Sequence, residues 1–121
     1  MYAPPPKLNL LVIRSPDIDR AAIFYQTLGL LLDLHSHGSG PEHFVAVVDG
    51  LAFEIYPLLK GQLPTTDARL GFTVDSVDEL VPLLERAGAA VTVRPHDRDG
   101  GRHAVVTDFD GHRVELFTPA T

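Results

Sequence analysis

The side chains that could do chemistry in this 121-residue chain are carboxylates, imidazoles and guanidinium groups. The chain contains no cysteine, which excludes disulfides, thiolate metal ligands and a cysteine nucleophile. Six histidines and sixteen acidic residues are present. Imidazoles and carboxylates can bind a divalent metal together, and a carboxylate can act as a general base beside a guanidinium group that neutralises negative charge.

Three histidines stand close together around a glycine-rich segment. His35 and His37 alternate onto one face of an expected strand, and His43 follows after Gly38-Ser-Gly40. One interpretation is a metal site made of His37, His43 and Glu54. The other is a set of exposed imidazoles around a hairpin, and the sequence favours it because spacing alone does not make ligands converge.

The remaining histidines lie in the second half of the chain. His96 and His103 flank the charged segment 97–102, and His112 stands in an expected turn. We expect 97–102 to be a mobile loop, which makes it a candidate lid over a cleft.

The secondary structure that must position these side chains is repeated along the chain. Segment 17–29 carries apolar residues at the spacing of one buried helical face, and segment 76–88 repeats that pattern 59 positions later. Each segment begins with a suitable N-cap, Asp17 or Ser76, and ends with a glycine where a left-handed C-terminal cap belongs. The sequence therefore predicts two equivalent helices.

Extended segments surround the two helices in the same order. One precedes each helix and three follow it: 8–14, 31–35, 44–48 and 51–56 in the first half, then 69–74, 90–94, 103–107 and 113–117 in the second. Asp49-Gly50 is typical of a two-residue hairpin turn. We therefore expect an α+β fold of two tandem βαβββ modules, whose sheets form a cleft suited to a ligand.

Length and composition are those of one globular domain, 45% hydrophobic and 21% charged. We expect a flexible N-terminus (1–7) and a single domain (8–121) made of modules 8–56 and 69–121 with a linker 57–68. The net charge of −6 without a basic stripe argues against a nucleic-acid partner. No apolar signal segment or membrane-length run is present, so a cytoplasmic protein without membrane association is expected.

Two motifs make the chain resemble the vicinal oxygen chelate superfamily of glyoxalases, bleomycin-resistance proteins and dioxygenases. The first leads from Ser15-Pro-Asp-Ile-Asp-Arg20 to Phe24-Tyr-Gln-Thr-Leu-Gly29, and the second is Asp108-Phe-Asp-Gly-His-Arg-Val-Glu-Leu116. The resemblance covers 8–119 and implies the same two-module fold. It also implies a homodimer, in which the cleft forms either within one chain or across two.

Metal-dependent members of that superfamily use four cleft positions, usually His or Gln, Glu, His and Glu. Counting from the helix motifs, these positions hold Leu10, Glu54, Arg69 and Glu115 here, and the repeat gives the same register because 10 and 69 differ by 59 and 54 and 115 by 61. Leucine cannot coordinate a metal, and a guanidinium group repels one. The resemblance therefore implies no metal cofactor at the usual place, and it disfavours an extradiol dioxygenase, which needs two histidines.

Charge predicts how the remaining groups are arranged. Two carboxylates in a partly desolvated cleft repel each other, so one must be neutralised, and Arg69 could do this. We therefore expect Glu54, Arg69 and Glu115 to meet in one cleft. Two roles stay open: an ion-pair network without chemistry, or a site in which Glu115 or Glu54 is a general base.

Strand alternation places Leu10, Val12 and Arg14 on one face of the first strand. In glyoxalase I-like members an arginine four residues after the first metal position binds a substrate carboxylate, and Arg14 stands at that place. Tyr56 shares the face of Glu54 and could add a hydroxyl group or an aromatic wall. The other interpretation is that Arg14 is solvated at the strand end and Tyr56 only packs.

Two classes of function remain. The first is a metal-free protein of the bleomycin-resistance kind, which binds a small carboxylate or amphiphile. The second is a glyoxalase I-like lyase or isomerase with a cleft glutamate as general base. Without a metal an enolate loses its main electrophilic stabiliser, so the sequence favours the binding protein.

Overall fold

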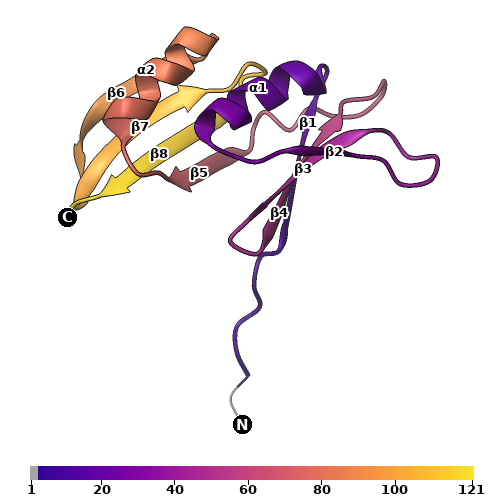
Figure 1. Ribbon diagram of the computed structural model, residues 1–121, viewed down its shortest axis with the longest axis horizontal. Coiled ribbons are helices and arrows are strands. Elements are labelled where there is room, and N and C mark those ends of the chain that lie inside the picture. The colour runs from indigo at the N-terminus through magenta and orange to yellow at the C-terminus, as the bar shows by residue number, and fades with distance from the viewer. Residues whose placement is uncertain (1–2) are drawn as a thin grey trace.

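The computed structural model describes residues 3–121 and has the predicted order of elements (Figure 1). The first module consists of β1 (Leu10–Ser15), α1 (Ile18–Leu28), β2 (Asp33–His35), β3 (His43–Val48) and β4 (Leu51–Pro57). The second consists of β5 (Arg69–Thr73), α2 (Val77–Ala87), β6 (Ala90–Arg98), β7 (Gly101–Thr107) and β8 (Arg113–Pro119). The strands form two four-stranded sheets, sheet one with the order β1-β4-β3-β2 and sheet two with the order β5-β8-β7-β6. The α+β fold of two βαβββ modules is therefore confirmed.

The predicted flexible N-terminus, 1–7, lies partly outside the described residues. Residues 3–9 have no regular secondary structure and lead away from the body of the molecule (Figure 1). Among the described residues no helix has the length and apolar character that crossing a membrane would require.

The helix boundaries follow from the caps read in the sequence. The side chain of Asp17 accepts a hydrogen bond from the backbone N–H of Arg20, and Ser76 does the same for Glu79. Gly29 and Gly88 end the helices at φ angles of 123° and 119°, which favour glycine. Local sequence thus sets where both helices begin and end.

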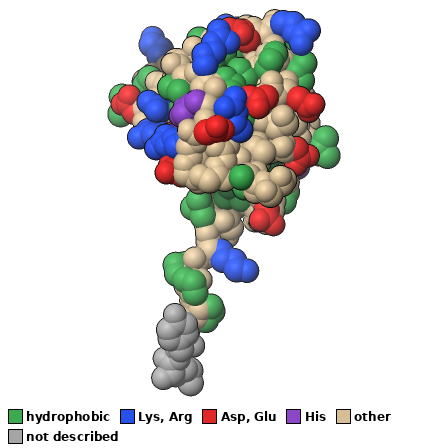
Figure 2. Space-filling view, turned by 90° about the vertical axis from the view of Figure 1, so that its left-hand side faces the viewer, with side chains coloured by type: hydrophobic (Ala, Val, Ile, Leu, Met, Phe, Trp, Pro, Cys, Tyr) green, Lys and Arg blue, Asp and Glu red, His purple; other side chains and the backbone are tan. Residues whose placement is uncertain are grey.

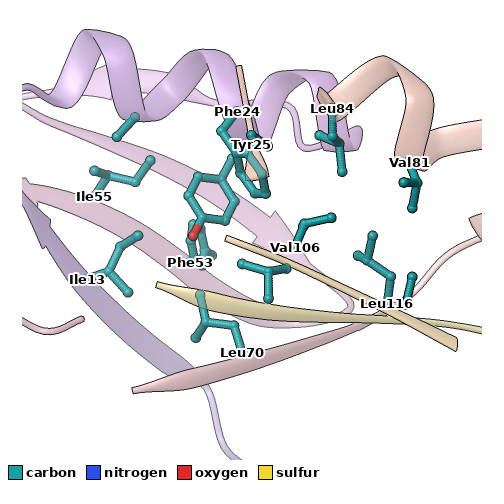
Figure 3. Close-up of a cluster of buried hydrophobic side chains, with 14 of the residues drawn as sticks. Ile13, Phe24, Tyr25, Phe53, Ile55, Leu70, Val81, Leu84, Val106 and Leu116 are labelled. Carbon is teal, nitrogen blue, oxygen red and sulfur yellow. The ribbon is translucent and has the colours of Figure 1, made fainter. Parts of the chain in front are cut away.

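One hydrophobic core joins the two modules (Figure 3). Each sheet has an inner face that contacts the helices and an outer face turned away from them. Ile13 and Phe53 come from the inner face of sheet one and Leu116 from that of sheet two, and all three are almost fully buried. Tyr25 of α1 lies between the sheets, with its ring centroid 4.8 Å from Phe53 and 6.4 Å from Phe72 of β5. The outer faces are therefore the surfaces left free for a ligand or a partner.

The prediction of a mobile loop at 97–102 was wrong. β6 continues to Arg98 and β7 begins at Gly101, so only Asp99-Gly100 turns between them, at φ angles of 50° and 80°. Positive φ at both residues is the geometry of a tight hairpin, and Asp49-Gly50 has it too. The segment is therefore a paired β-hairpin with a two-residue turn, and not a loop.

The end of the molecule that carries this hairpin is densely charged (Figure 2). Figure 2 shows basic side chains gathered there with acidic ones between them. Arg102 bridges Asp78 and Asp97, and Arg94 pairs with Glu85. Because these pairs are exposed, each contributes little to stability, and they shape the electrostatics of the surface instead.

Candidate functional site

The outer face of sheet one carries five of the predicted site residues. Leu10, Val12 and Arg14 alternate with the inward-facing Leu11, Ile13 and Ser15, and Leu10 is 49% exposed. β1 pairs with β4 in parallel, which sets Val12 opposite Glu54 and Arg14 opposite Tyr56. The face is thus apolar near Leu10 and polar near Arg14.

Arg14 is held in place by the linker between the modules. Its Nη1 donates to Oε1 of Gln62 at 3.0 Å and to the carbonyl oxygen of Pro57 at 3.5 Å. Its backbone N–H donates to Oγ1 of Thr65 at 2.9 Å. Within residues 3–121 its Nε and Nη2 make no hydrogen bond, so they can take an anion from the outer face.

Glu115 is the centre of the polar group on the outer face of sheet two. Arg69 donates to its Oε2 from both Nε, at 3.0 Å, and Nη2. Nε of Arg113 lies 3.7 Å from the same oxygen, and Nε2 of His103 lies 3.4 Å from Oε1. The hydrogen bonds from Arg69 outweigh the opposing effect of burial and hold the pKa of Glu115 below its ordinary value. A carboxylate held in this way is a weak base.

A hollow of about 340 Å³ lies beside this group, between β5, β8 and the β6–β7 hairpin. Its lining includes Thr73, Arg98, His103, Glu115 and Phe117. It therefore combines an aromatic wall with cationic and anionic groups.

Glu54 does not join Arg69 and Glu115 within one chain. No hydrogen bond or ion pair links it to either of them among residues 3–121. The reason is architectural: the inner faces of the two sheets line one core, and Glu54 and Glu115 lie on the outer faces, turned away from that core. The meeting of the three groups stays a prediction, now for an assembly of two chains.

The four superfamily metal positions do not fit a metal here. Leu10 has no donor atom, and Arg69 places its guanidinium group on the carboxylate of Glu115. Of the four positions, Glu54 alone has a carboxylate without an ion pair among residues 3–121, and one carboxylate makes a poor site.

A second group of potential ligands is structural. Asp108, Asp110 and His112 each place one potential ligand atom within 4.8 Å of those of the other two. This is the one group of this kind found in residues 3–121. Oδ1 of Asp108 accepts three backbone N–H groups of its own turn, at 2.9 to 3.0 Å, and Oδ2 accepts the hydroxyl group of Tyr25 at 2.6 Å. Nδ1 of His112 lies 2.8 Å from Oδ2, so the potential ligand atoms of Asp108 and His112 are already engaged with each other and with their neighbours.

This network connects the modules, and sequence reasoning missed it. Tyr25 comes from α1 and Asp108 from the β7–β8 turn of the other module. Nε2 of His112 lies 2.7 Å from Oγ1 of Thr65 in the linker, which in turn holds the backbone of Arg14. The motif Asp108-Phe-Asp-Gly-His112 was the only feature of the sequence that pointed to this network. It indicated a turn, but it did not indicate that Tyr25 or Thr65 would bind to that turn.

The histidines of the first module form a cluster. The ring centroids of His37 and His43 are 5.4 Å apart, and His35 lies 6.0 and 6.2 Å from them. The predicted grouping of His37 with His43 is thus present. His35 completes the cluster, and among residues 3–121 no hydrogen bond or ion pair joins Glu54 to it.

Comparison with known proteins places the chain in a family. A model of the glyoxalase/bleomycin resistance protein/dioxygenase superfamily matches residues 7–116, and the chain belongs to that superfamily. An uncharacterized protein of Mycolicibacterium smegmatis is 25% identical over 118 residues, which cover 93% of this chain and 94% of that protein.

Solved structures agree with this fold. Hypothetical protein SA1046 from S. aureus matches with a TM-score of 0.76 at 19% identity, over 96% of this chain and 95% of the other. TnmS3, an antibiotic binding protein from Streptomyces sp. CB03234, matches with a TM-score of 0.75 at 24% identity, over 98% and 100%. At these identities the likeness shows the fold alone.

Proposed function

We propose that this protein binds a small molecule, with one carboxylate and an apolar body, and performs no chemistry on it. The observation that carries the proposal is the ion pair between Arg69 and Glu115 at two of the superfamily metal positions. It neutralises the carboxylate that would otherwise act as ligand or base. What remains at the outer faces is a surface suited to binding.

The ligand class follows from the groups around Arg14. A guanidinium group held by Gln62 has two nitrogens free to receive a carboxylate in a bidentate arrangement. Leu10 and Val12 on the same face offer apolar contact, and Tyr56 is set beside Arg14. The net charge of −6 does not attract anions, but its field is screened beyond about 8 Å at physiological salt. TnmS3, an antibiotic binding protein of the same fold, supports a small-molecule ligand.

Removing the guanidinium group of Arg14 is expected to weaken binding of a carboxylate ligand by about tenfold to a hundredfold, the range for loss of a charged hydrogen bond. Calorimetry on carboxylates and amphiphilic antibiotics, chosen by a thermal-shift screen, would measure this in Arg14→Ala. Arg86→Ala is the matched control, because Arg86 is an exposed arginine of α2 whose Nε bonds Pro82 of its own helix. Unchanged carboxylate binding in Arg14→Ala, or stabilisation by cationic ligands alone, would exclude the proposed site.

We further propose that two copies complete the cleft, the outer face of sheet one of each chain facing the outer face of sheet two of the other. β1 and β5 are both edge strands with a free side. Leu10 and Val47 on sheet one are 49% and 75% exposed, which is apolar area that a partner would cover. In such a dimer Glu54 of one chain would approach Arg69 and Glu115 of the other.

The expected result is a homodimer in sedimentation equilibrium at micromolar concentration. Leu10→Asp should shift the protein toward monomer, because it places a charge on the apolar contact face. Leu31→Asp serves as control, since Leu31 is 88% exposed and lies outside both outer faces. A wild-type protein that stays monomeric at all concentrations would rule out the shared cleft.

Glu54 favours a second candidate function. It is the one superfamily carboxylate without an ion pair among the described residues, so no cation occupies the position where a substrate would approach it. A glyoxalase I-like isomerase or lyase would use it as general base. Incubating the bound ligands with the protein and following them by NMR separates the cases: conversion that disappears in Glu54→Gln would favour the enzyme.

A further inference from the structure

The histidine cluster of the first module lies on the outer face of sheet one, at the end of the face where Tyr56 stacks on His43. His35 and His43 are directly opposite each other in the antiparallel pair β2–β3, so their side chains share a face. His37 follows two residues after His35, in a turn that the backbone N–H of Gly40 closes onto the carbonyl oxygen of His37 at 2.9 Å. The topology thus brings three imidazoles from one short hairpin together.

His43 is held in an orientation suited to binding a metal. Its Nδ1 lies 3.1 Å from the carbonyl oxygen of Pro41, which places the ring proton on Nδ1 and the lone pair on Nε2. The hydroxyl group of Tyr56 lies 3.3 Å from Nε2, so a metal ion would have to displace this hydrogen bond. Metal-binding histidines commonly donate their second nitrogen to a backbone carbonyl in this way. Tyr56 stacks on the ring at 4.1 Å and 10°, and the side chain of His43 is almost fully buried. The ring is therefore fixed before any ion arrives.

The spacing of the rings is close to that of a three-histidine site. Zinc–nitrogen bonds of about 2.0–2.1 Å in tetrahedral geometry put ring centres about 5 Å apart. The three centroid distances are 5.4, 6.0 and 6.2 Å. The nitrogens of the three histidines do not all lie within 4.8 Å of one another, whereas the potential ligand atoms of Asp108, Asp110 and His112 do. Convergence requires both His35, which is half-buried, and His37, which is exposed, to rotate toward the fixed ring of His43.

The internal repeat shows what is special about the first module. His96 and His103 form the equivalent pair in β6–β7, with ring centroids 5.2 Å apart. They stand 61 and 60 positions after His35 and His43. The residue 61 positions after His37 is Arg98, whose guanidinium group cannot coordinate a metal. Both modules thus have a histidine pair, and at the position next to the pair the first module has His37 where the second has Arg98.

We propose that His35, His37 and His43 bind one divalent transition-metal ion of the class that prefers imidazole, such as Zn²⁺ or Ni²⁺. Three neutral ring nitrogens suit these ions and leave a coordination position for water or an anionic ligand. Asp33, two residues before His35 in β2, adds negative charge on the same face. The proposed metal ligands are not among the residues assigned to carboxylate binding, although Tyr56 contacts His43 and also lies beside Arg14.

Calorimetric titration of chelator-treated protein, freed of any histidine tag, with Zn²⁺ and with Ni²⁺ at pH 7.5 tests this proposal. We expect one equivalent per chain with a micromolar or tighter Kd. His37→Ala and His35→Ala should each weaken binding at least tenfold, and neither substitution opens the core because both side chains lie at the surface. His43→Ala is avoided because the buried ring also supports folding.

His96→Ala is the matched control, since it removes a histidine from the equivalent pair that has no third imidazole. It should leave the wild-type affinity unchanged. Lowering the pH to 5.5 should abolish binding, because protons compete for the ring nitrogens. A wild-type Kd in the millimolar range, or equal affinities for wild type and His37→Ala, would overturn the proposal.

Discussion

Replacing Asp108 by alanine should lower the free energy of unfolding by about 3–5 kcal/mol, the cost of removing one partner from a buried charged network. The substitution leaves three backbone N–H groups and the hydroxyl group of Tyr25 without their acceptor. Because Tyr25 belongs to the other module, the loss also weakens the contact between modules. Urea unfolding followed by circular dichroism and by tyrosine fluorescence would measure it.

Asp110→Ala is the control for this substitution. Asp110 lies in the same turn, but its side chain accepts no hydrogen bond among the described residues, and its Oδ2 is buried without a partner. Removing it should change the free energy of unfolding by less than about 1 kcal/mol. If Asp108→Ala were no more costly than Asp110→Ala, the network would not be what joins the modules.

The pH dependence of stability gives the same network a second readout. Burial raises the pKa of Asp108, but the contacts with His112 and Tyr25 outweigh it and hold the pKa below its ordinary value of 3.8. Its contribution to stability is therefore present above pH 3.8 and is lost as the pH falls through the lowered pKa. Burial, and then the charge of Asp108, raises the pKa of Tyr25 far above 10.0, so a further contribution is lost as the pH rises past 10.0. Asp108→Ala should lessen the acid loss and Tyr25→Phe the alkaline loss.

Residues near one another in the sequence were the ones whose structure could be predicted. Caps such as Asp17 and Gly29 act over three or four residues, and the turn Asp49-Gly50 acts over two. Neighbouring residues alone therefore determine these structures. The outer-face positions of Leu10 and Arg14 follow from strand alternation, which is equally local. Asp99-Gly100 carried the same local signal and was mistaken for part of a loop because charged residues surround it.

Contacts between distant segments could not be predicted in this way. Tyr25 and Asp108 are 83 positions apart, and a sequence does not state which buried hydroxyl group meets which carboxylate. The separation of Glu54 from Glu115 has the same origin. The register of the repeat placed both glutamates on the correct strands. Whether the sheet faces that carry them meet depends on how the two modules pack, and the shared core around Tyr25 and Phe53 determines that packing.

Gly101→Ala should destabilise the protein by about 3 kcal/mol, at the upper end of the range for overpacking. A Cβ atom on Gly101 would lie 2.6 Å from Cζ of Phe117 and closer still to the backbone oxygen of Thr118, which cannot move without breaking the β7–β8 pair. Phe117 lines the hollow beside Glu115, which would face the shared cleft of the proposed dimer, so the same shift should also weaken ligand binding there. Thermal and urea unfolding, with calorimetry on the ligand, would measure both effects.

Gly71→Ala separates this clash from a general intolerance of larger residues at the hollow. Gly71 lines the same hollow and lies in β5, but a Cβ atom there would meet nothing within 4 Å and its backbone is not in the left-handed region. Alanine should therefore be neutral or stabilise slightly, by about 0.5 kcal/mol, because it restricts the unfolded chain. Equal loss in both variants would mean that the hollow tolerates no added methyl group. If Gly101→Ala were as stable as Gly71→Ala, β8 would have to shift away from β7 to make room for the added methyl group. The close packing of β8 on the β6–β7 hairpin described above would then have to be abandoned.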